Sequence, residues 1–417
     1  MNRRLVRSIL WPLHERLRRR PTTRLLKALR AGERLPPEAI EQMQAVALRE
    51  VLTHAVCAVP YYRWRFEQHS LNPDQVRSLA DLPRVPFLTK DLVRTHGDDL
   101  IDPVLRRRLT PHTTSGSTGA PLAFHIDRLR TAADNAARAR YRAWWGVWPG
   151  DREALVWGSR GDLDRQGPVH RFRDRLFNTL VLPAADLGEA ALDEMAAALC
   201  RFRPQIVFGY AAALGRLAAR LLDGAGGDKP PRPKVVVATA EVFLPTDRRT
   251  VTAAFGCGAA AEYGSRECGV VAGECPNGGL HVAAENALVE IVEPDGDALV
   301  PAGEAGEIVI TLLRPYGMPM IRYRTGDVGR LAAAPCGCGI GLPLLADVEG
   351  RRRDLIRLPG GRVVHPSVFS KAMAEAECVA RYRVVQTGPA EIDIEVCGAA
   401  EGLDAPLGRS APNWATA

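Results

Sequence analysis

Hydrophobic residues recur at helical spacing in residues 40–70 and 189–203, and an alanine- and arginine-rich stretch, residues 130–145, predicts a further helix. Two β-branched runs, residues 205–208 and 234–239, have the composition of buried strands. Helices therefore alternate with buried strands through the middle of the chain. This alternation predicts an α/β fold in which helices are layered on a sheet.

The pattern changes after residue 280. Residues 288–292 and 307–311 read as antiparallel strands around a turn at residues 295–296. A second change comes at residues 350–361, which are first charged and then rich in proline and glycine, and we place a domain boundary there. The chain after that boundary is short for an independent domain.

The first twenty residues alternate arginine with leucine, isoleucine and tryptophan. One interpretation is a basic helix that lies on an anionic membrane surface. The favoured interpretation is a helix docked on the domain, with Trp11, Leu13 and Leu17 directed at the core. The segment lacks a signal-peptide core, and no run approaches the ~20 apolar residues of a membrane span. We therefore expect a cytoplasmic protein without a transmembrane segment.

The composition of the 417 residues is globular, because 46% are hydrophobic and 25% are charged. Collagen-like and disordered chains are excluded. The nine cysteines are an odd number and argue for a reducing compartment rather than a disulfide scaffold. The formal charge of +7 permits anionic substrates such as nucleotides but does not indicate nucleic-acid binding. Lysine is scarce, with only five positions: Lys27, Lys90, Lys229, Lys234 and Lys371.

The most specific local motif is TTSGSTGAP, residues 113–121. Its glycines allow the backbone to approach an anion, and its hydroxyl and N–H groups can surround phosphate oxygens. No Gly-Lys-Ser/Thr sequence closes it, so it is not a Walker loop. Taken alone, it is equally well explained as a Ser/Gly turn.

Three further motifs follow in order: AEYGSRE at residues 261–267, MPMIRYRTGD at 318–327 and GRRRD at 350–354. Upstream lie VPYYR at residues 59–63 and LPRVPFLTK at 82–90. Together these motifs resemble the adenylate-forming (acyl-AMP) ligase superfamily. They are most similar to its phenylacetate–CoA ligase and CapK-like (coenzyme F390 synthetase-like) branch, over residues 45 to about 375.

The resemblance implies the architecture and the boundaries of the domains. A large N-terminal adenylation domain of layered sheets and helices would span residues 1–353, with a mostly helical part over 1–100. Asp354 would be the hinge to a small α+β C-terminal domain, residues 354–417, which we expect to be truncated. From about residue 398 the tail is rich in alanine, glycine and proline, and we expect it to be disordered.

The resemblance also implies the residues of an ATP site. The ATP phosphates would be held by six consecutive residues: Thr114, Ser115, Gly116, Ser117, Thr118 and Gly119. The adenine ring would lie near Ala240, Glu241, Tyr263 and Gly264. Ser265 would reach the α-phosphate, and Glu267 would hold Mg²⁺ through a hard carboxylate oxygen. Asp327 would accept hydrogen bonds from the ribose hydroxyls, with Arg351 beside them.

The implied activity is ATP-dependent activation of a small carboxylic acid as acyl-AMP, followed by transfer to a thiol such as coenzyme A. The acid is not specified, although Trp157, Gly209, Tyr210 and Tyr263 are candidates for its pocket. The acceptor could be coenzyme A, a carrier-protein thiol or an amine. The alternatives are a relic that binds nucleotide without turnover and an acyl-adenylate-dependent transferase in polysaccharide biosynthesis. A homodimer is compatible with the resemblance.

Four potential metal ligands occur in two glycine-rich loops: Cys275, His281, Cys336 and Cys338. Three thiols and one imidazole make a complete tetrahedral zinc set, which leaves no open position and so implies a structural role. The spacing is not that of a standard zinc finger, and the resemblance to a Cys/His set of the CapK-like branch supports the assignment. Cys268 is an alternative ligand or a spare thiol near the site, and ordinary loop residues are the other interpretation.

Two departures from the family pattern weaken the prediction of activity. Ala120 stands where the phosphate loop usually continues toward a lysine, and only an arginine could replace that charge. Family members also carry a lysine in the small domain, whereas this sequence has none after Lys371. We therefore expect an incomplete small domain and impaired adenylation.

Overall fold

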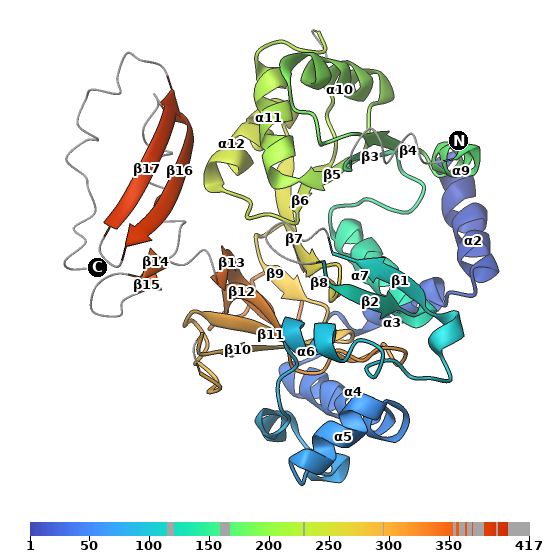
Figure 1. Ribbon diagram of the computed structural model, residues 1–417. Helices are drawn as coiled ribbons and strands as arrows, with labels where there is room; N and C mark the ends of the chain where they lie inside the picture. Colours follow the sequence, from blue (N-terminus) through green and yellow to red (C-terminus); the bar gives the residue numbers. More distant parts are fainter. Residues whose placement is uncertain are drawn as a thin grey trace. The chain divides into compact units, whose positions relative to one another are not determined.

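The computed structural model describes residues 1–114, 121–158, 167–227, 230–294, 296–352, 356–357, 363–364, 369, 379–388 and 391–398 (Figure 1). The chain divides into two compact units, Met1–Val348 and Glu349–Ala417. The predicted boundary lies after residue 353, and the predicted hinge, Asp354, lies outside the described residues. So does the tail after residue 398.

One sheet of eleven strands organises the first unit, in the order β10-β11-β12-β13-β9-β8-β7-β6-β5-β3-β4. The half that ends at β4 is parallel, because β4, β3, β5, β6 and β7 all pair in the same direction. These strands are β3 (Glu153–Val156), β4 (Thr179–Leu182), β5 (Ile206–Tyr210), β6 (Val235–Thr239) and β7 (Gly258–Ser265). The sequence prediction of buried strands at 205–208 and 234–239 is therefore confirmed by β5 and β6.

The other half of the sheet is built on antiparallel pairs. Its strands are β8 (Gly269–Glu274), β9 (Leu280–Val282), β10 (Ala287–Val292), β11 (Gly306–Leu312), β12 (Tyr323–Leu331) and β13 (Leu344–Arg351). Strands β10 and β11 confirm the predicted antiparallel pair, with Val289 opposite Ile310. A separate pair, β1 (Thr110–Thr113) and β2 (Ala123–Ile126), lies on either side of the predicted phosphate loop.

Among the described residues of the first unit, the α-helices are α1 (Arg3–Leu5), α2 (Trp11–Leu17), α3 (Thr22–Gly32), α4 (Pro37–Ala58), α5 (Pro60–Gln68), α6 (Lys90–Thr95), α7 (Arg128–Trp144), α9 (Pro168–Leu176), α10 (Glu189–Phe202), α11 (Ala211–Leu222) and α12 (Pro245–Phe255). A π-helix, η1 (Val6–Leu10), joins α1 to α2. Short 3₁₀ helices are η2 (Pro73–Gln75), η3 (Leu79–Arg84) and η4 (Arg106–Arg108). No helix among the described residues is long and apolar enough to cross a membrane.

The predicted helix over residues 40–70 is two helices, α4 and α5, so that prediction was wrong in one respect. Val59 separates them in an extended conformation, with φ −109° and ψ 116°. Pro60 causes the break, because its ring disfavours a helical conformation at the preceding residue. Pro60 then occupies the first turn of α5, where a missing N–H is tolerated.

The two faces of the parallel strands pack against different partners, because alternate residues point to opposite sides of a sheet. Ala154, Val207 and Val236 pack with α10, α11 and α12 in one core. Leu155, Phe208 and their neighbours pack on the other face with Val147 and Trp157. Helix α7 brings arginine side chains to this second face, where the candidate site contains a cavity.

The described residues of the second unit include two antiparallel hairpins. One pairs β14 (Ile356–Arg357) with β15 (Val363–Val364), and the other pairs β16 (Val379–Gly388) with β17 (Glu391–Gly398).

A buried arginine links the N-terminal segment to the antiparallel half of the sheet. Arg322 is 1% exposed and donates two hydrogen bonds to the Glu290 carboxylate, both at 3.0 Å. It also donates to the carbonyls of Pro83 and Val85, at 3.0 and 2.8 Å. Its guanidinium carbon lies 3.9 Å from the centre of the Phe87 ring. One side chain thus fixes the 82–90 segment against β10.

We predict that Arg322→Leu destabilises the protein by about 3–5 kcal/mol, because it leaves the Glu290 charge buried and unpaired. Burial already raises the pKa of Glu290, and Arg322 opposes that effect. Without Arg322 the pKa rises further, so folding takes up a proton and the loss is larger at about pH 8 than at about pH 5. Thermal unfolding at both pH values measures this difference.

The double variant Arg322→Leu/Glu290→Leu should recover much of the loss, since no charge is left unpaired. Arg24→Leu, at an exposed position of α3, is the matched control and should change stability by less than about 0.5 kcal/mol. Equal losses in the single and double variants would contradict the prediction.

Candidate functional site

Two tyrosine–carboxylate pairs join the predicted nucleotide-binding motifs. The Tyr263 hydroxyl in β7 donates a hydrogen bond to Asp327 Oδ2 in β12 at 2.9 Å. The Tyr323 hydroxyl donates to Glu267 Oε1 at 3.2 Å. Both carboxylates are buried, Asp327 at 7% and Glu267 at 5% exposure. The structure thus brings together the predicted ribose ligand, the predicted Mg²⁺ ligand and Tyr263.

The two tyrosines are permanent hydrogen-bond donors. Burial raises the pKa of Tyr263 well above its ordinary value, and the adjacent Asp327 charge raises it further. Burial also raises the pKa of Tyr323, and the adjacent Glu267 charge raises it further. Neither hydroxyl ionises near neutral pH, so each keeps its carboxylate oriented.

Gly264 and Ser265 end β7, directly before the turn that carries Glu267. A Cβ on Gly264 would lie 2.2 Å from the Gly269 carbonyl oxygen, so only glycine allows β7 and β8 to pair this closely. The Ser265 hydroxyl accepts a hydrogen bond from the Cys268 N–H at 3.0 Å. Cys268 is buried in the core, and burial raises the pKa of its thiol to about 12. It is therefore the spare thiol near the site and not a member of the Cys/His cluster described below.

Lys90 is a site residue to which the sequence analysis gave no role. Its Nζ donates to the Thr325 carbonyl at 2.8 Å, and a Cβ on Gly326 would lie 3.7 Å from the same nitrogen. Its ammonium therefore lies beside the Thr325–Asp327 stretch of β12, which carries the Asp327 carboxylate. Lys90 begins α6, where the Thr89 hydroxyl caps the helix by accepting from Leu92 N–H at 3.3 Å. The scarcity of lysine, together with the LPRVPFLTK motif, was the signal that could have identified it.

The neck of the predicted phosphate loop is closed by paired hydrogen bonds. Thr114 N–H donates to the Leu122 carbonyl at 3.0 Å, and Leu122 N–H donates to the Thr114 hydroxyl at 2.9 Å. The other predicted phosphate ligands, Ser115 to Gly119, lie outside the described residues. Arg266 donates to the Thr113 carbonyl at 2.9 Å. A guanidinium thus lies at the neck of a loop that lacks the usual lysine.

The predicted adenine segment follows β6. Ala240 has φ +68°, a left-handed conformation that is strained for alanine, and such strain clusters at functional sites. The Glu241 carboxylate accepts a hydrogen bond from the Ala212 N–H at 2.9 Å, which ties the segment to the start of α11. Both residues are exposed at the carboxyl end of a parallel strand, where α/β sheets bind ligands.

A cavity of about 490 Å³ lies on the α7 side of the parallel strands. Its walls include Trp157, Phe208, Leu155 and Ile206. Trp157 stacks on Phe208 with ring centres 6.0 Å apart, and on Tyr210 at 4.2 Å. The volume lies within the range of small-molecule sites.

Two ion pairs border this cavity. Arg138 binds Glu262 through three hydrogen bonds of 2.7 to 3.2 Å, and Glu262 directly precedes Tyr263 in β7. Arg142 pairs with Glu153, and both guanidinium groups lie near the face of Phe208, at 5.4 and 5.3 Å for Arg142 and Arg138 respectively. The cavity therefore adjoins the nucleotide motif and combines aromatic walls with fixed hydrogen-bonding groups.

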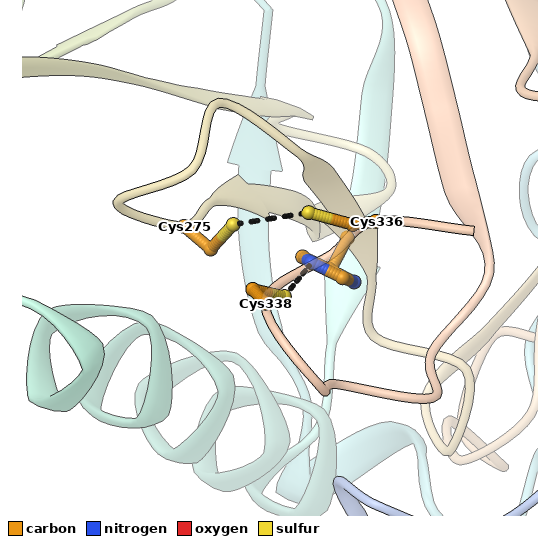
Figure 2. Close-up of side chains that lie close together, drawn as sticks. Cys275, Cys336 and Cys338 are labelled. Carbon is orange, nitrogen blue, oxygen red and sulfur yellow. Dashed lines mark hydrogen bonds between the residues drawn. The ribbon is translucent and has the colours of Figure 1, made fainter. Parts of the chain in front are cut away.

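A separate cluster contains Cys275, His281, Cys336 and Cys338, whose ligand atoms all lie within 4.8 Å of one another. The sulfurs of Cys275 and Cys336 are 3.7 Å apart, and Figure 2 shows these two thiols facing each other. Tetrahedral zinc–thiolate bonds place two sulfurs about 3.8 Å apart. Cys338 Sγ lies 3.2 Å from His281 Nε2. The predicted metal ligands are thus brought together at spacings that fit zinc.

The surroundings of the cluster hold its side chains in place. His281 Nδ1 lies 3.3 Å from the Leu342 carbonyl, and a bond there directs Nε2 toward the thiols. A Cβ on Gly279 would lie 2.8 Å from Cys336 Sγ and 3.2 Å from His281 Nε2. Only glycine therefore leaves room for the cluster, and a backbone hydrogen bond from Cys275 N–H to the Gly279 carbonyl, 2.9 Å, closes the loop around it.

The remaining predicted site residues belong to the second unit. Arg351 is the last residue of β13, and Asp354 lies outside the described residues.

No protein-family model matches the chain. It is 27% identical over 376 residues to a phenylacetate-coenzyme A ligase of Thermus thermophilus, covering 87% of this chain and 83% of that protein. It is 22% identical over 268 residues to protein CapK of Staphylococcus aureus, covering 64% and 58%.

The fold matches a crystal structure of 2-hydroxyisobutyryl-CoA ligase in the postadenylation state in complex with 2-HIB-AMP. The TM-score is 0.74 at 21% identity, with 88% of this chain and 80% of the other covered. The chain is therefore a relative of the phenylacetate-coenzyme A ligases and CapK, and it has the fold of the adenylate-forming ligases.

Proposed function

We propose that the protein activates a carboxylic acid with ATP as an acyl-adenylate and transfers the acyl group to the thiol of coenzyme A. The two hydrogen-bonded pairs that join the motifs, Tyr263–Asp327 and Tyr323–Glu267, carry this proposal. The names of the relatives and the acyl-AMP complex of the structural neighbour agree with it.

In the first step the substrate carboxylate attacks the α-phosphorus of ATP, and pyrophosphate leaves. In the second the thiol attacks the acyl carbonyl carbon, loses its proton, and AMP leaves. No protein nucleophile is required, so the side chains bind, orient and neutralise charge. Asp327 would bind the ribose hydroxyls, Glu267 would hold Mg²⁺, and Ser265 would contact the α-phosphate.

Two cations compensate for the alanine that follows the phosphate loop. Lys90 supplies an ammonium beside Thr325 in β12, and Arg266 supplies a guanidinium at the neck of the loop. A compact ammonium concentrates its charge more than a guanidinium does. We therefore assign the larger share of charge neutralisation to Lys90.

The acyl part of the acid occupies the cavity beside Glu262. Trp157 and Phe208 provide flat apolar walls, whereas Arg138 and Arg142 provide N–H groups held by carboxylates. Such walls favour a planar or aromatic acid with a polar substituent over a long aliphatic chain.

Exchange of labelled pyrophosphate into ATP, measured against a panel of aryl and aliphatic acids, tests the proposed function. We predict acid-dependent exchange in the wild type, and a loss of about 10²-fold or more in Glu267→Gln and Asp327→Asn, because each removes a charge that binds the reacting complex. Glu304→Gln, at an exposed turn position, is the control and should leave exchange unchanged.

ATP binding, measured by calorimetry, distinguishes the ligase from the main alternative, which is a protein that binds the nucleotide without turnover. Binding of ATP without exchange for any acid would reject the ligase and indicate a protein that only binds the nucleotide.

A second prediction concerns Lys90. Lys90→Met should raise the KM for ATP and lower kcat for exchange, because the site loses positive charge near the phosphates. Lys27→Met, an exposed lysine of α3, serves as the matched control and should behave as wild type. Unchanged exchange in Lys90→Met would show that the ammonium only stabilises β12 through its hydrogen bond to Thr325.

We further propose that the Cys275, His281, Cys336 and Cys338 cluster binds one structural zinc ion. Four protein ligands complete the tetrahedron and leave no position for a substrate. The ion would hold the β8–β9 turn to the loop before β13 and would take no part in the chemistry.

Metal analysis and thermal unfolding test this assignment. The purified wild type should contain about one equivalent of zinc, and Cys336→Ser/Cys338→Ser should lose the metal and unfold at a lower temperature. Cys57→Ser, an exposed cysteine elsewhere in the unit, should change neither quantity. Less than about half an equivalent in gently purified wild type would contradict a structural site.

A further inference from the structure

The N-terminal helical segment, residues 3–17, is pinned to the first unit along one edge. Val6 is fully buried, and a Cβ on Gly150 would lie 2.7 Å from the Val6 Cβ. The Asn178 side chain accepts from the Met1 amino group at 2.9 Å and donates to the Met1 carbonyl at 3.1 Å. Arg7 lies over the Trp148 ring at 3.9 Å. The first turns are therefore fixed to the domain.

The other end of the segment is fixed by a buried carboxylate. Glu15 is 3% exposed and accepts a hydrogen bond from the Thr22 hydroxyl. His14 lies 3.1 Å from the same carboxylate and packs edge-on against Phe177 at 5.1 Å. The orientation of the helix about its own axis is thus determined at both ends.

This orientation leaves a row of four aliphatic side chains in solvent. Their exposed fractions are 40% for Leu5, 55% for Ile9, 49% for Leu13 and 75% for Leu17. The sequence analysis expected Leu13 and Leu17 to face the core, and that expectation was wrong. Of the three residues expected to face the core, Trp11, Leu13 and Leu17, only Trp11 is partly buried. We call Leu5, Ile9, Leu13 and Leu17 the N-terminal stripe.

The π-helix η1 keeps the stripe straight. In a regular α-helix, positions four residues apart drift by about 40° around the axis at each step. A π-helical turn holds more residues, so η1, over Val6–Leu10, offsets part of that drift. The stripe therefore stays on one side of the helix while Val6 and Glu15 stay on the domain side.

Positive charge surrounds the stripe. The first twenty residues contain seven arginines and one acidic residue, Glu15, which is buried. Six of these arginines are exposed: Arg3, Arg4, Arg7, Arg16, Arg18 and Arg19. Two further apolar side chains, Val169 and Phe172, are 76% and 68% exposed on α9. The segment thus presents aliphatic side chains together with cations that no nearby acid on the same segment neutralises.

We propose that the N-terminal stripe and its arginines dock the protein on the surface of an anionic phospholipid bilayer. Aliphatic side chains on one face of a helix insert at the boundary of head groups and acyl chains, and arginines bind the phosphates above them. Charge complementarity selects this partner, because a second copy of the same basic segment would repel it. The helix lies on the membrane rather than crossing it.

Co-sedimentation of the full chain with vesicles tests the proposal. Wild type should bind vesicles containing phosphatidylglycerol and should bind phosphatidylcholine vesicles at least about tenfold more weakly. Binding should weaken further in high salt, which screens the arginine–phosphate attraction. Ile9→Ser/Leu13→Ser/Leu17→Ser should lower binding to the anionic vesicles by about tenfold or more, because three inserting side chains are lost.

The matched control is Val104→Ser/Leu222→Ser/Leu299→Ser, which removes three exposed aliphatic side chains elsewhere in the unit and should bind as wild type. Circular dichroism and size-exclusion chromatography verify that both variants are folded. Absence of wild-type binding to anionic vesicles would overturn the proposal, as would equal loss in the two triple variants. A wild-type dimer that the stripe variant converts to monomer, without vesicle binding, would overturn it in favour of self-association.

Discussion

The arrangement of the first unit depends on the burial of one guanidinium group. Arg322 adopts a left-handed backbone conformation, φ +47°, at the entry to β12, and its side chain satisfies Glu290 and two carbonyls of the 83–85 segment. Its own carbonyl accepts from Leu88 N–H at 3.0 Å, and Leu88 forms a parallel bridge to Tyr323. This register places Lys90 beside the Thr325 carbonyl and Tyr323 against Glu267. A charge buried in the core thus sets the geometry of a site several residues away.

The carboxylates of the candidate site are held in place by hydrogen-bond donors that do not ionise. Tyr263 and Tyr323 remain protonated and hold two carboxylates in place. Orientation of this kind is set before a ligand arrives, so binding does not require the carboxylates to reorganise. The same logic applies to Arg138, which presents hydrogen-bonding groups to the cavity while Glu262 compensates its charge.

The sequence predicted two of the five parallel strands, β5 and β6, because apolar runs such as residues 234–239 can be buried on both faces only as central strands. The ordered motifs also predicted which residues meet: Tyr263, Glu267 and Asp327 lie more than sixty residues apart at the extremes, yet share one site. Lys90 was missed although its motif and the scarcity of lysine mark it, because the pattern of side chains does not show which backbone carbonyl a lysine contacts. The prediction for the N-terminal helix was wrong. Hydrophobic periodicity gives the spacing of an apolar face, but it does not show which face packs on the domain. Here the face with Val6 packs, and the face with Leu13 and Leu17 is exposed.

The Cys/His cluster also constrains the route of the chain between the two units. Its last two cysteines precede β13, whose first residue, Leu344, pairs with His281 in β9. Strand β13 then continues to Arg351 and crosses the division at Val348. The start of β13 is therefore anchored in the first unit by its pairing with β9, before the chain reaches the division at Val348.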